Sequence, residues 1–181
     1  MKKSLLLLGG ALVLFSNSAF GWGKMGHDAI AYIAECNLTP KAKKTIEKIL
    51  GHSIVYYATW MDEWRAEPGY EHTSAWHTAS VDKNLVYAPR PKGDVIFALE
   101  DAIAKLQDYK QQDDSTVVMS LRCIIHFVGD MHCPVHVKYA DQKSYNVYLN
   151  GDKCSYHNVW DDQIISRSHR WGYLEYAHQL D

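Results

Sequence analysis

The sequence predicts a mainly α, single-domain fold of helices with a small β-hairpin. Most of the chain after residue 21 falls into segments whose apolar residues recur every three or four positions. Residues 141–150 instead alternate weakly between apolar and polar residues and end in Asn150-Gly151, a strong turn signal. The 181 residues suffice for one ordinary domain and show no break in composition that would divide them.

Residues 1–21 have the pattern of a secretory signal peptide. Two lysines precede an apolar run over residues 5–15, and Ala19 and Gly21 occupy the small-residue positions before a cleavage site. A transmembrane helix needs about 20 apolar residues, and neither this run nor any later one reaches that length. We therefore expect an exported protein, periplasmic or secreted, that begins at Trp22 and does not associate stably with a membrane. Residues 22–181 would form its single domain.

The charge balance argues against a polycationic binder of nucleic acid. Without Lys2 and Lys3 the mature chain has 17 basic and 21 acidic residues, a formal charge near −4. A phosphate ester substrate would therefore need local positive charge, such as bound cations.

The four cysteines are Cys36, Cys123, Cys133 and Cys154. In an exported protein they permit two disulfides in three connectivities, among which the sequence does not choose. Because none forms a C-x-x-C pair, we do not expect a thiolate zinc site.

Helices are expected first over residues 28–36, 42–50 and 54–65. Thr39 is a suitable N-cap with Pro40 at the first helical position, and Gly51 is a natural C-cap. Residues 67–93 lose the helical period and are expected to form a loop with short extended pieces.

The second half is expected to contain helices at 94–112, 115–131, 157–166 and 173–180. The helix at 115–131 is the most apolar of them, so it should be the central buried helix. The hairpin at 141–150 would lie between this helix and the last two.

Two ionisable residues interrupt that apolar central helix. His126 and Asp130 are four residues apart and so point the same way. They could share a hydrogen bond, or they could offer two ligands to one or two cations.

The same spacing recurs at His157 and Asp161, and His136 follows just after Pro134. Two such pairs with a third histidine favour a metal site over separate buried histidines. Further candidates are His77 and Asp62, which are embedded among aromatic residues, and His27, which follows the expected cleavage site closely.

Five motifs, taken in order, resemble those of the S1/P1 nuclease family, part of the phospholipase C/P1 nuclease superfamily. They cover nearly all of the mature chain, and their joint order and spacing are specific. They are Trp22-Gly23-x-x-Gly26-His27; Thr59-Trp60-x-Asp62-x-x-Arg65; Trp76-His77; His126-Phe127-x-Gly129-Asp130-x-His132-x-Pro134-x-His136; and His157-Asn158-x-Trp160-Asp161.

The resemblance implies a helical fold that holds three Zn²⁺ ions at the base of a cleft. One zinc would be bound by Asp62, His77 and His126, and a second by His136, His157 and Asp161. A third would be bound by the α-amine and carbonyl oxygen of Trp22 together with His27, and Asp130 would bridge it to the first. Removal of the signal peptide before Trp22 would create the amine ligand.

The resemblance also implies hydrolysis of a phosphodiester by activated water, with Asp62 orienting the water or accepting its proton. The substrate would be single-stranded nucleic acid, RNA or DNA, or nucleotides, and the products would carry 5′-phosphates. Arg65 matches a basic position that would contact phosphate or anchor a neighbouring carboxylate, and His132 would support the ligands without binding metal.

Two features depart from the family pattern. Thr78 follows the Trp-His pair where the family commonly has an aromatic residue for base stacking, a contact worth about 1–3 kcal/mol per base. Tyr70, Trp76 or Tyr145 could substitute for it. Family members also usually continue for several helices beyond the position of Asp181, so the domain is expected to be short at its C-terminus.

Two alternatives remain open from the sequence. A phospholipase C of the bacterial phosphatidylcholine type has a similar zinc cluster, although it would favour a glutamate in the last ligand pair. A zinc-bound protein without catalytic activity, or an inactive truncated homologue, would keep the metal without turnover.

Overall fold

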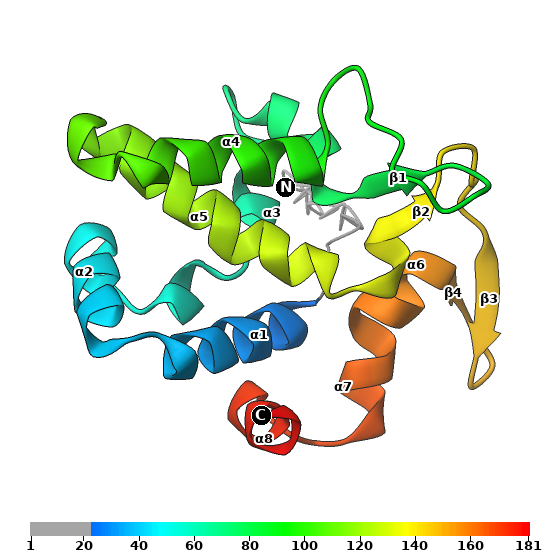
Figure 1. The fold of residues 1–181 in the computed structure, drawn as a ribbon. Helices are drawn as coiled ribbons and strands as arrows, with labels where there is room; N and C mark the ends of the chain where they lie inside the picture. Colours follow the sequence, from blue (N-terminus) through cyan, green and yellow to red (C-terminus); the bar gives the residue numbers. More distant parts are fainter. Residues whose placement is uncertain (1–22) are drawn as a thin grey trace, which may run out of the picture.

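The computed structural model describes residues 23–181, which form a mainly helical body as the sequence predicts (Figure 1). The signal peptide expected at residues 1–21 and the ligand expected at Trp22 lie outside the described residues. No helix within residues 23–181 is long and apolar enough to cross a membrane. The α-helices are α1 (Lys24–Asn37), α2 (Pro40–Leu50), α3 (Trp60–Trp64), α4 (Val95–Gln107), α5 (Asp114–Met131), α6 (Tyr156–Asn158), α7 (Ile164–Ser168) and α8 (Tyr173–Leu180).

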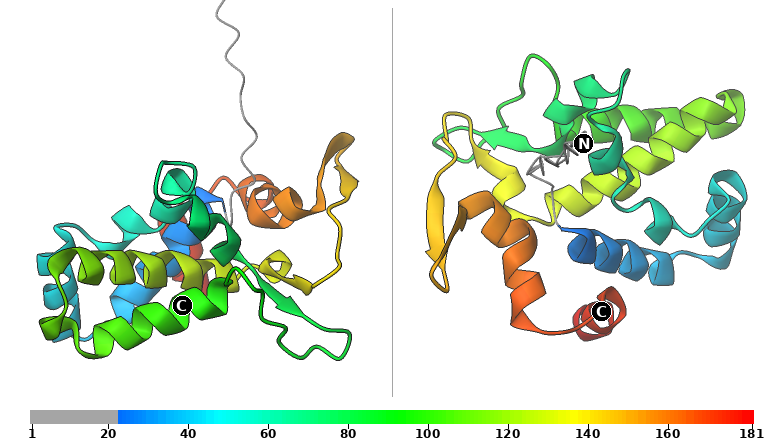
Figure 2. Two further views of the ribbon diagram at one scale, coloured as in Figure 1. Left: turned by 90° about the horizontal axis from the view of Figure 1, so that it is seen from above. Right: turned by 180° about the vertical axis from the view of Figure 1, so that it is seen from behind.

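Helix α5 is the central helix, as predicted from its apolar sequence. It runs beside α4 and also contacts α1, α2 and α3 (Figures 1 and 2). Phe127 on α5 and Met61 on α3 are fully buried in the core. The buried face of α5 therefore brings residues from both halves of the chain together.

The predicted caps of α2 are confirmed. The Thr39 hydroxyl accepts a hydrogen bond from the Ala42 amide at 3.2 Å, and Pro40 is the first helical residue. Gly51 ends the helix with φ of 79°, a left-handed conformation that glycine adopts without strain.

The helix expected over residues 54–65 is interrupted. It consists of a 3₁₀ turn, η1 (Ile54–Tyr57), followed by α3. Between them the fully buried Ala58 gives its carbonyl oxygen to His126 Nδ1, at 2.7 Å. The helical pattern thus breaks at the residue whose carbonyl binds α5, a contact with a segment distant in sequence.

The region expected to be a loop, residues 67–93, contains more helix than predicted. A 3₁₀ segment, η2 (Glu71–His77), ends at His77, and the short strand β1 (Ala79–Val81) follows. Strand β1 pairs in parallel with β2 (Val137–Tyr139), with Ala79 opposite Val137. This pairing, which the sequence did not reveal, holds the segment after His77 beside the segment after His136.

The predicted hairpin and its Asn150-Gly151 turn are present, but the strands are β3 (Asn146–Leu149) and β4 (Asp152–Ser155), so the hairpin extends beyond the expected residues 141–150. The strands are antiparallel with Leu149 opposite Asp152. The two-residue turn has φ of 53° at Asn150 and 90° at Gly151, as an Asn-Gly turn requires. In Figure 1 the hairpin stands at one edge of the molecule, away from α2.

The two disulfides that the sequence permits are not formed in this structure, in which all four cysteines have free thiols. Cys36 is exposed near the end of α1, whereas Cys123 is buried within α5. Cys133 is fully buried beyond the end of α5, where its thiol contacts Asp161. Cys154 lies on β4. The four side chains are thus distributed over separate parts of the fold.

Candidate metal centre

The C-terminal half of α5 carries the buried ionisable residues that the sequence indicated. His126 and Asp130 are both 0% exposed. Because His126 Nδ1 donates to the Ala58 carbonyl, its Nε2 faces the carboxylates. The main chain thus fixes the orientation of the ring.

The first group of possible metal ligands comprises Asp62, His77 and His126. Asp62 Oδ1 lies 3.5 Å from His77 Nδ1 and 3.9 Å from His126 Nε2. The two ring nitrogens are 3.1 Å apart. This group contains the three residues that the family resemblance assigned to one zinc.

The second group comprises His27, His126 and Asp130. His27 Nε2 lies 3.5 Å from Asp130 Oδ1, and its ring stacks on that of His126 with centroids 4.3 Å apart. The close approach of His27 to α5 depends on Gly129, because a Cβ at that position would lie 2.5 Å from His27 Nδ1.

The third group comprises Cys133, His136 and Asp161, with His157 beside it. His136 Nε2 lies 3.4 Å from Asp161 Oδ1, and His157 Nε2 lies 2.8 Å from Asp161 Oδ2. The rings of His136 and His157 are stacked with centroids 5.0 Å apart. The i, i+4 spacing of His157 and Asp161 is carried by α6 and a π-helical segment, η5 (Val159–Gln163).

Asp130 links the three groups. Its carboxylate lies within 3.5 Å of ring nitrogens from four histidines: His27, His77, His126 and His136. The first two groups share His126, and the contact to His136 connects them to the third.

Two opposing effects, burial and ion pairing, determine the pKa values of the side chains in the site. Burial lowers the pKa of His27 and His77, so these rings are neutral at neutral pH. Burial also acts to lower the pKa of His136, but the carboxylates of Asp130 and Asp161 outweigh it and raise that pKa to about 9.

The carboxylates shift in the opposite direction. Burial acts to raise the pKa of Asp130, but the surrounding imidazoles outweigh it and hold the pKa well below its usual value. The pKa of Asp161 is lowered in the same way, with the rings of His136 and His157 outweighing burial. Both side chains are therefore anionic at neutral pH, as metal ligands must be.

The ring nitrogens and carboxylate oxygens of these groups are arranged to bind a cation rather than to form hydrogen bonds with one another. A buried polar atom without a hydrogen bond costs about 1–3 kcal/mol, yet several ligand candidates leave such atoms facing their neighbours at 2.8–3.9 Å. Lone pairs that converge without hydrogen-bond alignment are expected where an ion binds. Among the ligand candidates, the buried atoms without a hydrogen-bond partner in the described residues are His27 Nδ1 and Nε2, Asp62 Oδ1, His77 Nε2, Asp130 Oδ1, His136 Nδ1 and Nε2, and Asp161 Oδ2.

A cleft of about 480 Å³ opens onto these groups. His77, His136 and His157 line it. Its walls carry basic side chains and two tyrosines, Tyr145 and Tyr156, whose rings stack with centroids 4.7 Å apart. The basic side chains are Arg65, Arg90, Lys138 and Lys143. Local positive charge thus exists in a chain whose overall charge is negative.

The departure at Thr78 is visible in this cleft. Thr78 lines the wall, and its hydroxyl and carbonyl oxygens accept hydrogen bonds from Arg90. Of the aromatic residues considered as substitutes, Tyr145 lies in the cleft, whereas Trp76 packs against Phe127. Tyr70 packs edge-on against Trp60 and Trp64.

Two further candidates occupy supporting positions. Arg65 Nη1 lies 3.3 Å from Asp62 Oδ1, so it anchors a candidate ligand as well as lining the cleft. His132 is exposed, and its Nδ1 bonds to the Val128 carbonyl at 2.8 Å, so it does not join the ligand groups.

Cys133 is the member of the site that sequence reasoning missed. Cys133 belongs to no C-x-x-C pair, although Cys133-Pro134-Val135-His136 has a C-x-x-H spacing that could have indicated it.

The first described residue touches the third group. The Gly23 amide donates a hydrogen bond to the Asp161 carbonyl, and the Gly23 carbonyl accepts from the Gly26 amide at 2.8 Å, at the start of α1. A Cβ at Gly23 would lie 2.8 Å from Asp162 Oδ1, so the approach is close.

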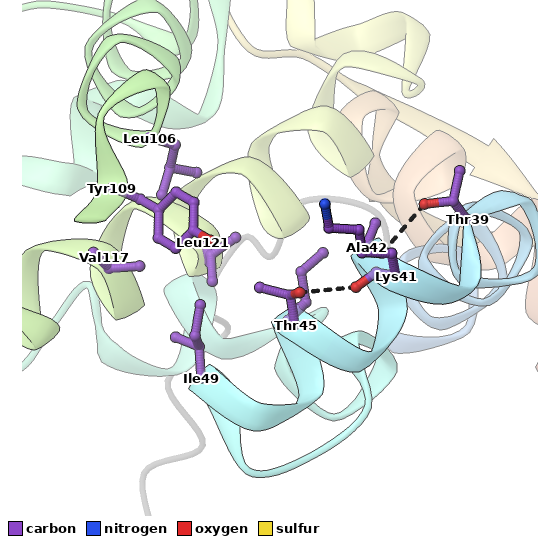
Figure 3. Close-up of a pocket in the computed structure, with 10 residues that line it drawn as sticks. Thr39, Lys41, Ala42, Thr45, Ile49, Leu106, Tyr109, Val117 and Leu121 are labelled. Atoms are coloured by element: carbon purple, nitrogen blue, oxygen red, sulfur yellow. Dashed lines mark hydrogen bonds between the residues drawn. The ribbon is translucent and has the colours of Figure 1, made fainter.

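A second cavity, of about 340 Å³, lies between α2 and the adjoining ends of α4 and α5 (Figure 3). Figure 3 shows Leu106, Tyr109 and Leu121 facing Ile49 and Thr45 across it. None of its lining residues belongs to the three ligand groups.

Comparison with known proteins agrees with this arrangement. Residues 22–180 match the model of a family described as S1/P1 Nuclease. Nuclease S1 of Aspergillus oryzae is 24% identical over 176 residues, which cover 88% of this chain and 60% of that protein. Endonuclease 2 of Arabidopsis thaliana is 28% identical over 163 residues, covering 80% of this chain and 56% of the relative. For nuclease P1 of Penicillium citrinum the identity is 28% over 157 residues, with coverages of 77% and 57%.

The chain therefore spans somewhat more than half the length of these curated relatives. The family match covers nearly all of the described residues, and the fold is mainly α, of the phospholipase C/P1 nuclease type. The chain belongs to the S1/P1 nuclease family.

Proposed function

We propose that the mature chain is an exported, zinc-dependent endonuclease that hydrolyses phosphodiester bonds of single-stranded RNA and DNA and leaves 5′-phosphorylated products. The observation that carries this proposal is the set of buried imidazoles and carboxylates that converge at the base of a cleft without hydrogen-bond partners among the described residues. The family match favours nucleic acid over a choline lipid as the substrate.

Each zinc is assigned to a set of side chains. Asp62, His77 and His126 would hold one, and His136, His157 and Asp161 would hold another. His27 would hold the third together with the amine and carbonyl oxygen of Trp22, and Asp130 would bridge the third to the first. Bound zinc would supply positive charge to the phosphoryl oxygens and lower the pKa of water to about 7.

Trp22 would gain its free amine when the signal peptide is removed. Its neighbour Gly23 is held against the Asp161 carbonyl, and consecutive Cα atoms are about 3.8 Å apart. The main-chain ligands of Trp22 would therefore be placed near the buried cluster by this contact.

Asp62 would orient the attacking water or accept its proton. Its buried Oδ1 has no hydrogen-bond partner among the described residues, and Arg65 Nη1 lies 3.3 Å from it and holds the carboxylate in place. A carboxylate fixed in this way is preorganised for one water position.

The cleft walls would bind the substrate. Lys138 and Lys143 offer charge to backbone phosphates, and Tyr145 offers an aromatic face to a base. The stacked Tyr156 limits the freedom of the Tyr145 ring.

The test is the zinc content of protein that begins at Trp22, measured together with hydrolysis of single-stranded DNA, single-stranded RNA and a phosphatidylcholine substrate. The control carries one extra alanine before Trp22, which blocks the α-amine and changes no side chain. We expect about three zincs and cleavage of the nucleic acids to 5′-phosphorylated ends. In the control we expect loss of the zinc assigned to Trp22 and His27, together with loss of cleavage. Zinc without cleavage would indicate a non-catalytic homologue, lipid cleavage a phospholipase, and absence of zinc would overturn the mechanism.

A further inference from the structure

Cys133 follows the central helix in a turn that directs it toward the third ligand group. After α5 ends, Cys133 is the N-cap of the 3₁₀ turn η4 (Pro134–His136). The His136 amide donates to the Cys133 carbonyl at 3.0 Å. Since a 3₁₀ helix has about three residues per turn, side chains three apart lie on the same side. The local backbone therefore pairs Cys133 with His136.

The sulfur lies among ligand atoms and away from solvent. Cys133 is 0% exposed, and its Sγ is 2.9 Å from Asp161 Oδ1. His136 Nε2 is 3.4 Å from that same oxygen. One donor atom from each of the three residues lies within 4.8 Å of the others.

Two residues beside the sulfur, His136 and Asp161, have buried polar atoms without hydrogen-bond partners among the described residues. His136 is 1% exposed, and neither ring nitrogen has a hydrogen-bond partner among the described residues. The same holds for Asp161 Oδ2, although His157 Nε2 is only 2.8 Å away. These buried donors converge on the space that the thiol also faces.

The spacing suits a tetrahedral ion. Bonds of about 2.0–2.3 Å from zinc to oxygen, nitrogen and sulfur place neighbouring ligand atoms roughly 3.3–3.6 Å apart. The separation between His136 Nε2 and Asp161 Oδ1 falls in that range, and the sulfur would need to move outward by only a few tenths of an ångström.

We propose that Cys133 is a fourth protein ligand of the cation held by His136, His157 and Asp161. The inference deepens the proposed function, on whose metal centre it rests. The Cys133 thiol would release its proton to solvent as the sulfur–metal bond forms. Four protein ligands would close this site, whereas three would leave a position open.

Cobalt substitution tests the proposal directly, because a thiolate bound to Co²⁺ gives a charge-transfer band in the near ultraviolet that imidazole and carboxylate ligands do not give. Metal-free protein beginning at Trp22 would be titrated with Co²⁺ alone. We expect the band in the wild type and in a variant whose only cysteine is Cys133 (Cys36→Ser, Cys123→Ala, Cys154→Ser). We expect it to be absent in Cys133→Ser.

A second measurement separates ligation from a hydrogen-bonding role. Serine retains a donor to Asp161, so a thiol that only donates a hydrogen bond predicts no band in the wild type and unchanged zinc retention in Cys133→Ser. Ligation predicts that Cys133→Ser and Cys133→Ala both lose zinc to a competing chelator at least about 10-fold more readily, since even outer partners of a metal site contribute that much. Circular dichroism of each variant checks that the helices remain.

The outcomes distinguish this inference from the proposed function. A cobalt band without nucleic acid cleavage supports Cys133 as a ligand and overturns the proposed nuclease function. Cleavage without a band supports the nuclease function and overturns Cys133 as a ligand. A band that survives in Cys133→Ser also overturns Cys133 as a ligand.

Discussion

Gly129 lies against the imidazole of His27, so close that a Cβ there would be 2.5 Å from His27 Nδ1 and 3.0 Å from its Cε1. Neither atom belongs to a flexible side-chain end, because His27 is 1% exposed and stacked on His126. The contact lets α1 deliver a ligand candidate to the face of α5.

We therefore expect Gly129→Ala to destabilise the protein by about 1–3 kcal/mol, the usual cost of overpacking. Alanine favours a helix over glycine by about 1 kcal/mol, so a stabilised variant would show that the contact is not tight. Urea unfolding measures the effect. The matched control is Val128→Ala on the neighbouring, exposed position, which should stay within about 0.5 kcal/mol of the wild type.

His126 belongs to two ligand groups at once. Its replacement by alanine should therefore reduce zinc content toward the ion held by His136, His157 and Asp161, and it should leave the Ala58 carbonyl without its partner. Elemental analysis of purified protein gives the zinc count. His132→Ala, which removes an exposed histidine two residues beyond Asp130, should keep the full count. Equal losses in the two variants would contradict the assignment.

Zinc binding at the third group should release protons. In metal-free protein the pKa of His136 is about 9, so this ring is protonated at pH 7, whereas zinc binds the neutral ring. Affinity should accordingly rise from pH 6 to about 9, where His136 has lost its proton. His27 and His77 have lowered pKa values and should contribute little to proton release at pH 7.

Calorimetric titration in buffers of different ionisation enthalpy measures the released protons. His136→Ala should weaken the pH dependence between pH 7 and 9 and leave the part that the Cys133 thiol contributes, since burial raises the pKa of that thiol. A wild-type affinity that is flat between pH 7 and 9 would contradict the role given to His136.

Asp94 should be a structural residue of the fold away from the metal centre. It is 0% exposed, and its Oδ1 accepts from the amides of Ile96 and Phe97 as the N-cap of α4. The Tyr87 hydroxyl donates to the same carboxylate at 2.9 Å. Asp94→Ala should cost about 1–2 kcal/mol through the lost cap, with a further loss from the unpaired hydroxyl.

Thermal and urea unfolding should report that loss, and Asp94→Asn should recover much of it because the amide oxygen can still accept the two backbone bonds. Zinc content should remain unchanged in both variants. A stable Asp94→Ala protein would show that α4 does not depend on this cap.

Local patterns in the sequence predicted those parts of the fold that local physics determines. The caps at Thr39 and Gly51, the apolar central helix and the Asn150-Gly151 hairpin are all set by neighbouring residues. The pairing of β1 with β2 was not predictable in this way, because residues 79–81 and 137–139 form strands of only three residues each, too short for a recognisable strand pattern.

In the site, too, local features were predictable from the sequence and features that depend on distant residues were not. The i, i+4 pairs His126–Asp130 and His157–Asp161 could be read from spacing, and the structure places both pairs in the buried cluster. The break at Ala58 and the position of Cys133 could not, because each depends on a partner far along the chain: His126 in the first case and Asp161 in the second.

The hydrogen bond between the Gly23 amide and the main-chain carbonyl of Asp161 joins the first described residue to the last residue of the ligand set. Contacts between such distant parts of a chain close large loops, and the entropic cost of closure grows with loop length. The consequence is an order of events: synthesis must pass Asp161 before the beginning of the mature chain can take its place. If Trp22 supplies the last ligands, loading of the complete metal centre reports that both ends of this stretch have reached their native positions.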